Sequence, residues 1–421
     1  MEPEKELKWL FVDMNSYFAS VEQQETPSLK DRPVAVLPMN SDYTCVIAAS
    51  YQAKAYGIKT GTRVKDAKIL CPDLHCVVAQ HDKYVAYHNK IIDAVSRYIP
   101  INKVWSIDEF SSRIPPGKRS TYHAQNIAQQ IRNTIWEKVG SSIHCSIGIS
   151  ANSLLAKIAA ECKKPSGLTI IHPNNIAQDL AKLNLNDVPG IGRNTTRRLH
   201  NAGIYSIPNF LNLPPKQIRK IWGSVEGERL WYLLHGYDID DQSTNTVMVG
   251  HSRVLDPELR CPEKARLMAR RLLCKACTRL RSKGFFAQKI LLSMHTQDHY
   301  KIIKEQRFSA SQNTFIFLNI LDELWARAII DFSDPGATKI KKISVILHDL
   351  VHHESATYDL LSLQEKMMHN RKENLNTSLL YLQKKYKKEV VTLGLPPKTL
   401  AGYVGTKIAF SRVPDKNEFW S

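Results

Sequence analysis

The chain has 421 residues, of which 43% are hydrophobic and 23% are charged, a composition typical of a soluble globular protein and unlike that of a disordered one. This length suggests two to four domains, each able to bury its own core. No run approaches the ~18 apolar residues that span a bilayer. The N-terminus carries acidic residues where a signal peptide would be basic, so we expect a cytoplasmic protein.

Positive charge is concentrated in the later part of the chain. Residues 1–110 carry 13 Lys and Arg against 14 Asp and Glu, a net charge of −1, so the rest of the chain contributes +19 to the total of +18. Such a distribution attracts a polyanion to the later domains and leaves a carboxylate-bearing region near the front. The pattern favours a nucleic-acid-binding protein.

The N-terminal third alternates short apolar runs with helical segments. Trp9 to Val12 predicts a buried strand that runs into a helix starting near Asn15 or Ser16. Asp13 would then lie at the C-terminal end of this strand. The segment NKVWSIDEFSSRI predicts one further strand with Asp108 and Glu109 in its middle. Other helices are expected over 51–56, 81–98, 121–138 and 151–162, and another strand over 143–149.

Asp13, Asp108 and Glu109 form a single site only if the fold brings their strands together. Otherwise Asp13 caps a helix and the other two face solvent. Three carboxylates within about 4 Å repel by roughly 4 kcal/mol per pair at an effective dielectric near 20, so cations would have to occupy the site. Oxygen ligands without neighbouring His or Cys favour magnesium or manganese over zinc. Two such ions can activate the attacking hydroxyl and stabilise the leaving group in a phosphoryl-transfer reaction.

Residues 173–240 read as short helices separated by VPGIG, AGI and LPP. Within this segment, Gly190 and Gly192 precede a helix that begins with Arg193. Glycines let backbone N–H groups approach a phosphate, and the helix N-terminus adds its dipole. The pattern resembles a helix-hairpin-helix that binds a DNA backbone; an ordinary helical turn is the alternative.

The segment 249–352 predicts a third unit in the order strand, helix, strand, strand, helix, strand. Residues 243–352 carry 18 basic and 10 acidic residues, a charge suited to phosphate contacts that do not read bases. A polar linker is expected at 241–248. The tail at 353–421 contains one candidate helix around 374–388.

The stretches VDMNSYFASVE, SIDE and SIGISANSLLAKIAAECKKPSG, followed by VPGIG, resemble the Y-family translesion DNA polymerases in order and spacing. CVIA is similar to the mutagenesis-protein branch and ASYQAKAYGIKTG to the polymerase IV branch. The resemblance implies an α/β (α+β) right-hand fold. Its expected parts are palm and fingers at 1–172 (fingers at about 25–80), thumb at 173–240, little finger at 249–352 and the tail.

The resemblance also implies an activity and a metal site. The activity is template-directed, low-fidelity synthesis of DNA from dNTPs on a primer, without proofreading, in translesion synthesis and DNA repair. In the family, the matching carboxylates bind two Mg²⁺ ions, for which Mn²⁺ is a possible substitute; here these are Asp13, Asp108 and Glu109, joined by the backbone carbonyl of Met14. A nucleotide contact is expected at Tyr17, and Phe18 holds the place of the aromatic that blocks a ribose 2′-hydroxyl.

The triphosphate ligands of the family fall on Tyr51, Lys54 and Lys164. Lys54 stands where relatives have Arg, so the charge is kept but the planar bidentate fork is lost. Ala48 stands where many relatives have Thr. Lys157 is a second candidate cation on the helix before Lys164 or a solvated surface residue. We expect Lys54 and Ala48 to change the affinity for the nucleotide but not the type of reaction.

Some interpretations stay open at this point. A degenerate sliding-clamp peptide is a candidate at Leu360–Leu363, and a monomer is expected. Cys274 and Cys277 are expected to be core thiols on a helix, because no second pair follows at zinc spacing. The alternatives to a polymerase are an inactive DNA-binding mutagenesis accessory and a metal-dependent nuclease.

Overall fold

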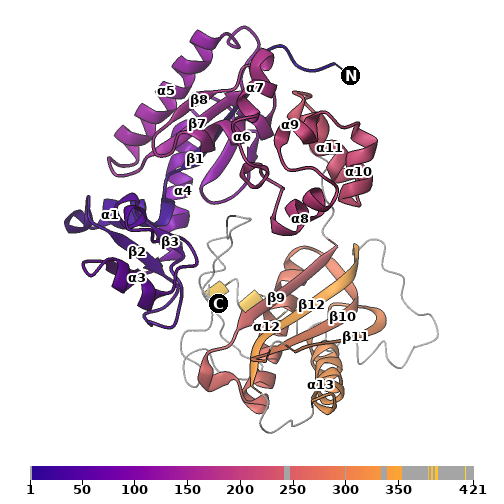
Figure 1. Cartoon of the computed structure of the whole chain (residues 1–421). Coiled ribbons are helices and arrows are strands. Elements are labelled where there is room, and N and C mark those ends of the chain that lie inside the picture. The colour runs from indigo at the N-terminus through magenta and orange to yellow at the C-terminus, as the bar shows by residue number, and fades with distance from the viewer. Residues whose placement is uncertain are drawn as a thin grey trace. The chain divides into compact units, whose positions relative to one another are not determined.

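A computed structural model describes residues 2–240, 247–298, 300–332 and 339–352, with residues 378, 381, 382, 385, 386 and 413 (Figure 1). One compact unit spans Met1–Asp241, and a second begins at Gln242. No helix in the described ranges is long and apolar enough to cross a membrane. Of the expected linker, only residues 247 and 248 are described. Of the expected tail helix, residues 378, 381, 382, 385 and 386 are described, and all five are helical.

A five-stranded sheet forms the centre of the first unit. Its strands are, in order across the sheet, β5 (Lys103–Val104), β6 (Glu109–Arg113), β1 (Trp9–Met14), β7 (Cys145–Ser150) and β8 (Leu168–Ile170). β1 is antiparallel to both of its neighbours, and β7 and β8 are parallel. β1 and β7 form the buried centre of the sheet, because Leu10 to Met14 and all residues of β7 are buried.

Alternation along β1 assigns its side chains to two different cores. Leu10 and Val12 belong to the larger core, which also contains residues of three helices, whereas Phe11 packs with Ala156 and Ala160 of α6 on the other face. Asp13 shares the face of Phe11 and therefore looks toward α6. The three helices of the larger core are α1 (Tyr17–Glu25), α4 (His81–Val95) and α5 (Thr121–Lys138). The helix on the opposite face is α6 (Ser153–Cys162).

The prediction of one continuous strand with Asp108 in its middle is wrong. The chain forms two short strands, β5 and β6, with a reversal between them, and Asp108 lies in the reversal rather than inside a strand. The backbone N–H groups of Trp105 and Ser106 both donate to the carbonyl of Glu109, at 2.9 and 3.2 Å. These bonds close a tight turn, which the alternation of apolar and polar residues did not reveal. The other helices and strands expected in this unit are confirmed to within a few residues.

A small three-stranded sheet is inserted between α1 and α4. Tyr17 donates its hydroxyl hydrogen to the carbonyl of Tyr84 at 2.7 Å. Tyr84 donates to Glu22, and Tyr87 to Glu25, each at 2.7 Å. These bonds join α1 to α4 at the base of the insertion. The inserted elements are β2 (Val34–Leu37), β3 (Ala48–Ala49), α2 (Tyr51–Ala55), α3 (Val64–Leu70) and β4 (His75–Val78), with Pro27–Leu29 forming a 3-10 turn.

Short helices with their own apolar core complete the first unit. They are α7 (Ile176–Leu180), α8 (Arg193–Asn201), α9 (Ile207–Leu211), α10 (Pro215–Trp222) and α11 (Val225–Leu234). Asn152 ties them to α6, because its amide donates to the carbonyls of Leu233 and Tyr237 at 2.7 and 2.9 Å.

The second unit has the expected βαββαβ order. It consists of β9 (Met248–Val254), α12 (Pro262–Ser282), β10 (Phe285–Thr296), β11 (Lys301–Ser311), α13 (Thr314–Ile330) and β12 (Ile340–His352). The strands form one antiparallel sheet in the order β11-β10-β12-β9, and both helices share a core with it. Cys277 is buried in α12, as expected of a core thiol, and Cys274 on the same helix is partly buried against this core.

The closeness of α6 to the central sheet depends on Gly148 of β7. A Cβ at this position would lie 1.9 Å from the carbonyl oxygen of Ala156 and 2.3 Å from the backbone nitrogen of Ala160. These are backbone atoms, so the helix could admit a side chain only by moving away from the strand. Gly148 thereby fixes how near α6 lies to Asp13.

We predict that Gly148→Ala lowers the free energy of unfolding by about 1–3 kcal/mol, because the added methyl group overpacks this contact. Urea unfolding followed by circular dichroism measures the change. Gly192→Ala is the control, since its φ is −87° and its added methyl group meets nothing within 4 Å. Equal destabilisation by the two substitutions would contradict the tight contact.

Candidate active site

Two of the expected carboxylates lie side by side on the central sheet. Asp13 of β1 pairs in register with Glu109 of β6, and on its other side with Ser146 of β7. Directly opposite residues in an antiparallel pair project to the same face. The three side chains therefore form a row on the face that α6 covers, and the convergence expected from sequence is observed for Asp13 and Glu109.

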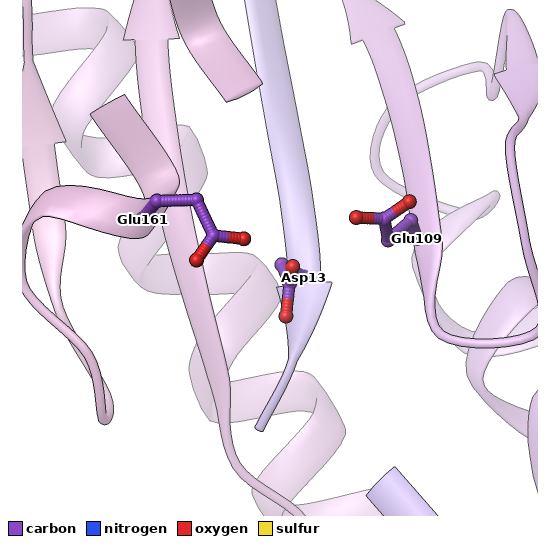
Figure 2. A group of neighbouring side chains, drawn as sticks. All are labelled: Asp13, Glu109 and Glu161. Carbon is purple, nitrogen blue, oxygen red and sulfur yellow. The ribbon is translucent and has the colours of Figure 1, made fainter. Parts of the chain in front are cut away.

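A third carboxylate comes from the last turn of α6. Oxygen atoms of Asp13, Glu109 and Glu161 lie within 4.8 Å of one another. Figure 2 shows the three side chains pointing toward a common space from β1, β6 and α6. Sequence reasoning missed Glu161. Its position four residues after Lys157, on the same helical face, was the signal that could have revealed it.

Asp108 lies next to this group but outside it. Its carboxylate accepts a hydrogen bond from the Ser106 hydroxyl at 2.5 Å, and its backbone carbonyl accepts the N–H of Met14 at 2.9 Å. Burial raises the pKa of Asp108, and Glu109 raises it further, whereas the Ser106 hydrogen bond lowers it. Asp108 is thus anchored to the end of β1, beside Asp13.

Two lysines of the α6 region offset the negative charge. Lys157 Nζ lies 2.6 Å from Glu109 Oε1. Lys164 Nζ lies 2.8 Å from Asp13 Oδ2 and 2.7 Å from Glu161 Oε1. The alternative that Lys157 is a solvated surface residue is therefore wrong.

Comparison with known proteins finds relatives that match most of the chain. Residues 12–161 match the impB/mucB/samB family, and residues 247–360 match its C-terminal domain. A DNA polymerase IV of Moorella thermoacetica is 32% identical over 68% of this chain and 72% of its own length. The chain belongs to the Y-family of translesion DNA polymerases. A DNA polymerase IV of Staphylococcus epidermidis is 28% identical over 72% of this chain and 84% of its own length.

Solved structures show the same fold. A Y-family DNA polymerase chimera superposes with a TM-score of 0.70 at 22% identity, covering 82% of this chain and all of the other. A structure described as an insertion ternary complex of a DNA polymerase superposes with a TM-score of 0.53 at 23% identity, over 82% of this chain and all of the other. These neighbours share the right-hand architecture that the sequence predicted.

The polymerase places Tyr51 and Lys54 near its carboxylates. Both lie on α2, which Ser50 caps by accepting the N–H of Ala53 at 3.2 Å. Lys54 Nζ stands 4.3 Å from the centre of the Tyr51 ring. Burial raises the pKa of the Tyr51 hydroxyl, which therefore stays a hydrogen-bond donor at neutral pH. Burial lowers the pKa of Lys54, and nearby Lys164 lowers it further.

Tyr17 and Phe18 occupy the first turn of α1. Tyr17 is buried, and its hydroxyl is bound to the carbonyl of Tyr84, so the contact that the structure gives its side chain is structural. Phe18 is 8% exposed and stacks on Tyr84, with ring centres 4.3 Å apart and planes inclined by 13°. The ring is thus held rigidly five residues after Asp13.

The hairpin before α8 has the expected backbone shape. Gly190 has a φ of +98°, which favours glycine, and Gly192 is the N-cap residue of α8. A Cβ at either glycine would meet nothing within 4 Å, so the backbone here is openly accessible. Sequence reasoning missed a second basic feature nearby, a surface hollow of about 490 Å³ lined by Lys216, Arg219, Lys220, Gly223, Ser224 and Val225.

The donor atoms of the carboxylate cluster suit a hard divalent cation. Asp13, Glu109 and Glu161 supply only oxygen, and neither His nor Cys belongs to the group. Such oxygen sites prefer Mg²⁺, Ca²⁺ or Mn²⁺ to Zn²⁺. The residues therefore fit the metal dependence of Y-family polymerases.

Burial raises the pKa of Asp13 from 3.8 to about 8, although Lys164 acts in the opposite direction. Between these two pH values the folded protein holds a proton that the unfolded chain has lost, so stability falls as pH rises through the window. Asp13→Asn cannot ionise. We predict that, in EDTA, the melting temperature of Asp13→Asn exceeds that of the wild type by a margin that grows by a few degrees from pH 5 to pH 8.

Differential scanning fluorimetry at several pH values measures this margin. Asp93→Asn, which replaces an exposed carboxylate of α4, is the control and is expected to show no such growth. A margin for Asp13→Asn that is constant or shrinks with rising pH would show that burial does not dominate the titration of Asp13.

Proposed function

We propose that Asp13, Asp108 and Glu109 bind two Mg²⁺ ions and that this site adds dNTPs to a primer end during translesion synthesis. The observation that carries the proposal is the pairing of Asp13 with Glu109 across β1 and β6, with Asp108 anchored beside them. When bound, such ions activate the primer hydroxyl and stabilise the departing pyrophosphate. The Met14 carbonyl is a further candidate ligand at the end of β1, and Mn²⁺ is a candidate substitute.

Lys164, Lys54 and Tyr51 are proposed to bind the triphosphate. Lys164 lies 2.8 Å from Asp13, so a phosphate beside the carboxylates would also lie within its reach. Lys54 and Tyr51 add a second cation and a hydroxyl donor from α2. Lysine binds phosphate as a point charge and cannot form the two parallel hydrogen bonds of an arginine guanidinium. Phosphate binding by Lys54 is therefore less directional than binding by arginine. Tyr17 supports the nucleotide site from within α1.

The primer–template is proposed to bind through its backbone. Gly190, Gly192 and Arg193 offer accessible N–H groups and a cation at the start of α8. Phosphate contacts of this kind hold any sequence, as a template-directed enzyme requires. The basic hollow at α10 and α11 extends this positive surface.

We propose palm and fingers at 1–172, thumb at 173–240, linker at 241–248, little finger at 249–352 and tail at 353–421. The clamp peptide at Leu360–Leu363 lies outside the described residues. We propose that the protein is a monomer. We also propose that it works in the cytoplasm, associated with the nucleoid, because the similar polymerases are bacterial.

We predict that Asp13→Asn, Asp108→Asn and Glu109→Gln each lower the rate of primer extension by on the order of 10³-fold, because each removes a carboxylate proposed to hold the cations that stabilise the transition state. Steady-state extension of a labelled primer with Mg²⁺ measures this loss. Glu137→Gln, which alters an exposed carboxylate on α5, is the control and should leave the rate unchanged.

Three outcomes of the same assay are decisive. Absence of incorporation by the wild type with any dNTP, with either Mg²⁺ or Mn²⁺, would overturn the polymerase assignment and favour a DNA-binding accessory. Shortening of the labelled strand without dNTPs would indicate a nuclease. Full activity in any of the three carboxylate variants would remove that residue from the catalytic set.

We predict that Phe18→Ala admits ribonucleotides, because the rigid ring that would meet a 2′-hydroxyl is lost. The ratio of kcat/KM for a dNTP to that for the matching rNTP should fall at least about tenfold. Phe18→Tyr keeps the ring and should keep the ratio. Unchanged sugar selectivity in Phe18→Ala would show that another residue excludes the ribose.

A further inference from the structure

Two segments that carry proposed site residues, the end of β1 and the loop after α6, meet strand β7 at the side chain of Asn15. This residue follows β1, and its side chain is almost fully buried, with 2% exposed. Its Nδ2 donates a hydrogen bond to the Ser146 hydroxyl at 3.0 Å. Its Oδ1 accepts the backbone N–H of Ser166 at 2.7 Å. One amide therefore joins the end of β1, the start of β7 and the loop between α6 and β8.

The loop from Lys163 to Gly167 needs such anchoring. Ser166 has a φ of +56°, a conformation that non-glycine residues rarely adopt and that neighbouring contacts must maintain. A Cβ at Gly167 would lie 1.7 Å from the Lys163 carbonyl oxygen, which shows how tightly the loop folds back. The Ser146 hydroxyl also accepts the N–H of Gly167 at 3.3 Å. Asn15 and Ser146 thus bind two successive N–H groups of this loop.

The loop carries Lys164. Its long side chain reaches Asp13 and Glu161 from a backbone position only two residues before Ser166. A lysine side chain has high rotational freedom, so its charge is well placed only if its backbone is fixed. Contacts at Ser166 and Gly167 provide that fixed base.

We propose that Asn15 is a positioning residue, which holds the Lys163–Gly167 loop so that Lys164 faces the phosphates of the incoming nucleotide. The inference rests on the proposed role of Lys164 in nucleotide binding. A neutral amide suits the position because it donates to Ser146 and accepts from Ser166 at the same time. Asn15 itself is buried beneath the site and does not contact the nucleotide.

A double-mutant cycle tests this link. We expect Asn15→Ala to raise the KM for dNTP about tenfold, the effect of one hydrogen bond to a charged group, while kcat and the half-saturating Mg²⁺ concentration change less than about twofold. Lys164→Ala should raise KM by itself. In the Lys164→Ala protein, Asn15→Ala should then add little, because the group it positions is gone.

Ser146→Ala is a milder variant that covers the case in which Asn15→Ala fails to fold. It removes the hydroxyl that binds Asn15 and Gly167 and should also raise KM. Ser150→Ala is the matched control, because both serines are fully buried on β7 and Ser150 bonds to the Ile171 carbonyl, at the other end of the strand. Its KM should stay at the wild-type value.

The inference and the proposed function fail in different ways. If Asn15→Ala raises KM equally in the presence and absence of Lys164, or if Ser146→Ala and Ser150→Ala behave alike, Asn15 does not act through Lys164. If the wild type extends primers and Lys164→Ala leaves KM unchanged, the nucleotide role of Lys164 is wrong, and this inference is overturned with it. A wild type that extends no primer overturns the proposed function itself.

Discussion

The crowding of carboxylates on one face of the central sheet, on the inner strands β1 and β6, governs the architecture around it. Asp13 and Glu109 face the same side because their strands pair in register, and Glu161 approaches them from α6. Such a group is costly unless positive charge lies within a few ångströms. Lys157 and Lys164 meet that requirement from the helix and from the loop that follows it. α6 and the loop after it therefore cover this face of the sheet and also supply the positive charge beside the carboxylates.

Close packing allows this arrangement to work. Lys157 and Glu161 reach the row of strand residues because α6 lies directly on β7 at Gly148, where no side chain intervenes. The buried Asn15 amide then ties the loop after α6 back to the same strands. Gly148 and Asn15, which are not proposed to touch the substrate, thus determine the positions of the charged groups. Both act through contacts with backbone atoms.

Much of the fold and part of the site could be predicted from sequence. The strand ending at Asp13 and the later helices have strong periodic patterns, and the motifs around Asp13 and Glu109 indicated one site. Asp108 was misplaced because a turn made by backbone hydrogen bonds leaves little trace in hydrophobic alternation. Glu161 and Asn15 were missed for a related reason. Their importance depends on which residues lie opposite them across β1, β7 and α6, and strand register is a property of the folded chain.

The insertion between α1 and α4 carries part of the proposed nucleotide site. It packs on the larger core through Val36 of β2, and tyrosine hydroxyls link the two helices that flank it. α2, which bears Tyr51 and Lys54, belongs to this insertion, whereas Asp13 and Glu109 lie on the central sheet. A change in the insertion that shifts α2 would therefore alter the proposed contacts to the triphosphate while the two carboxylates keep their register.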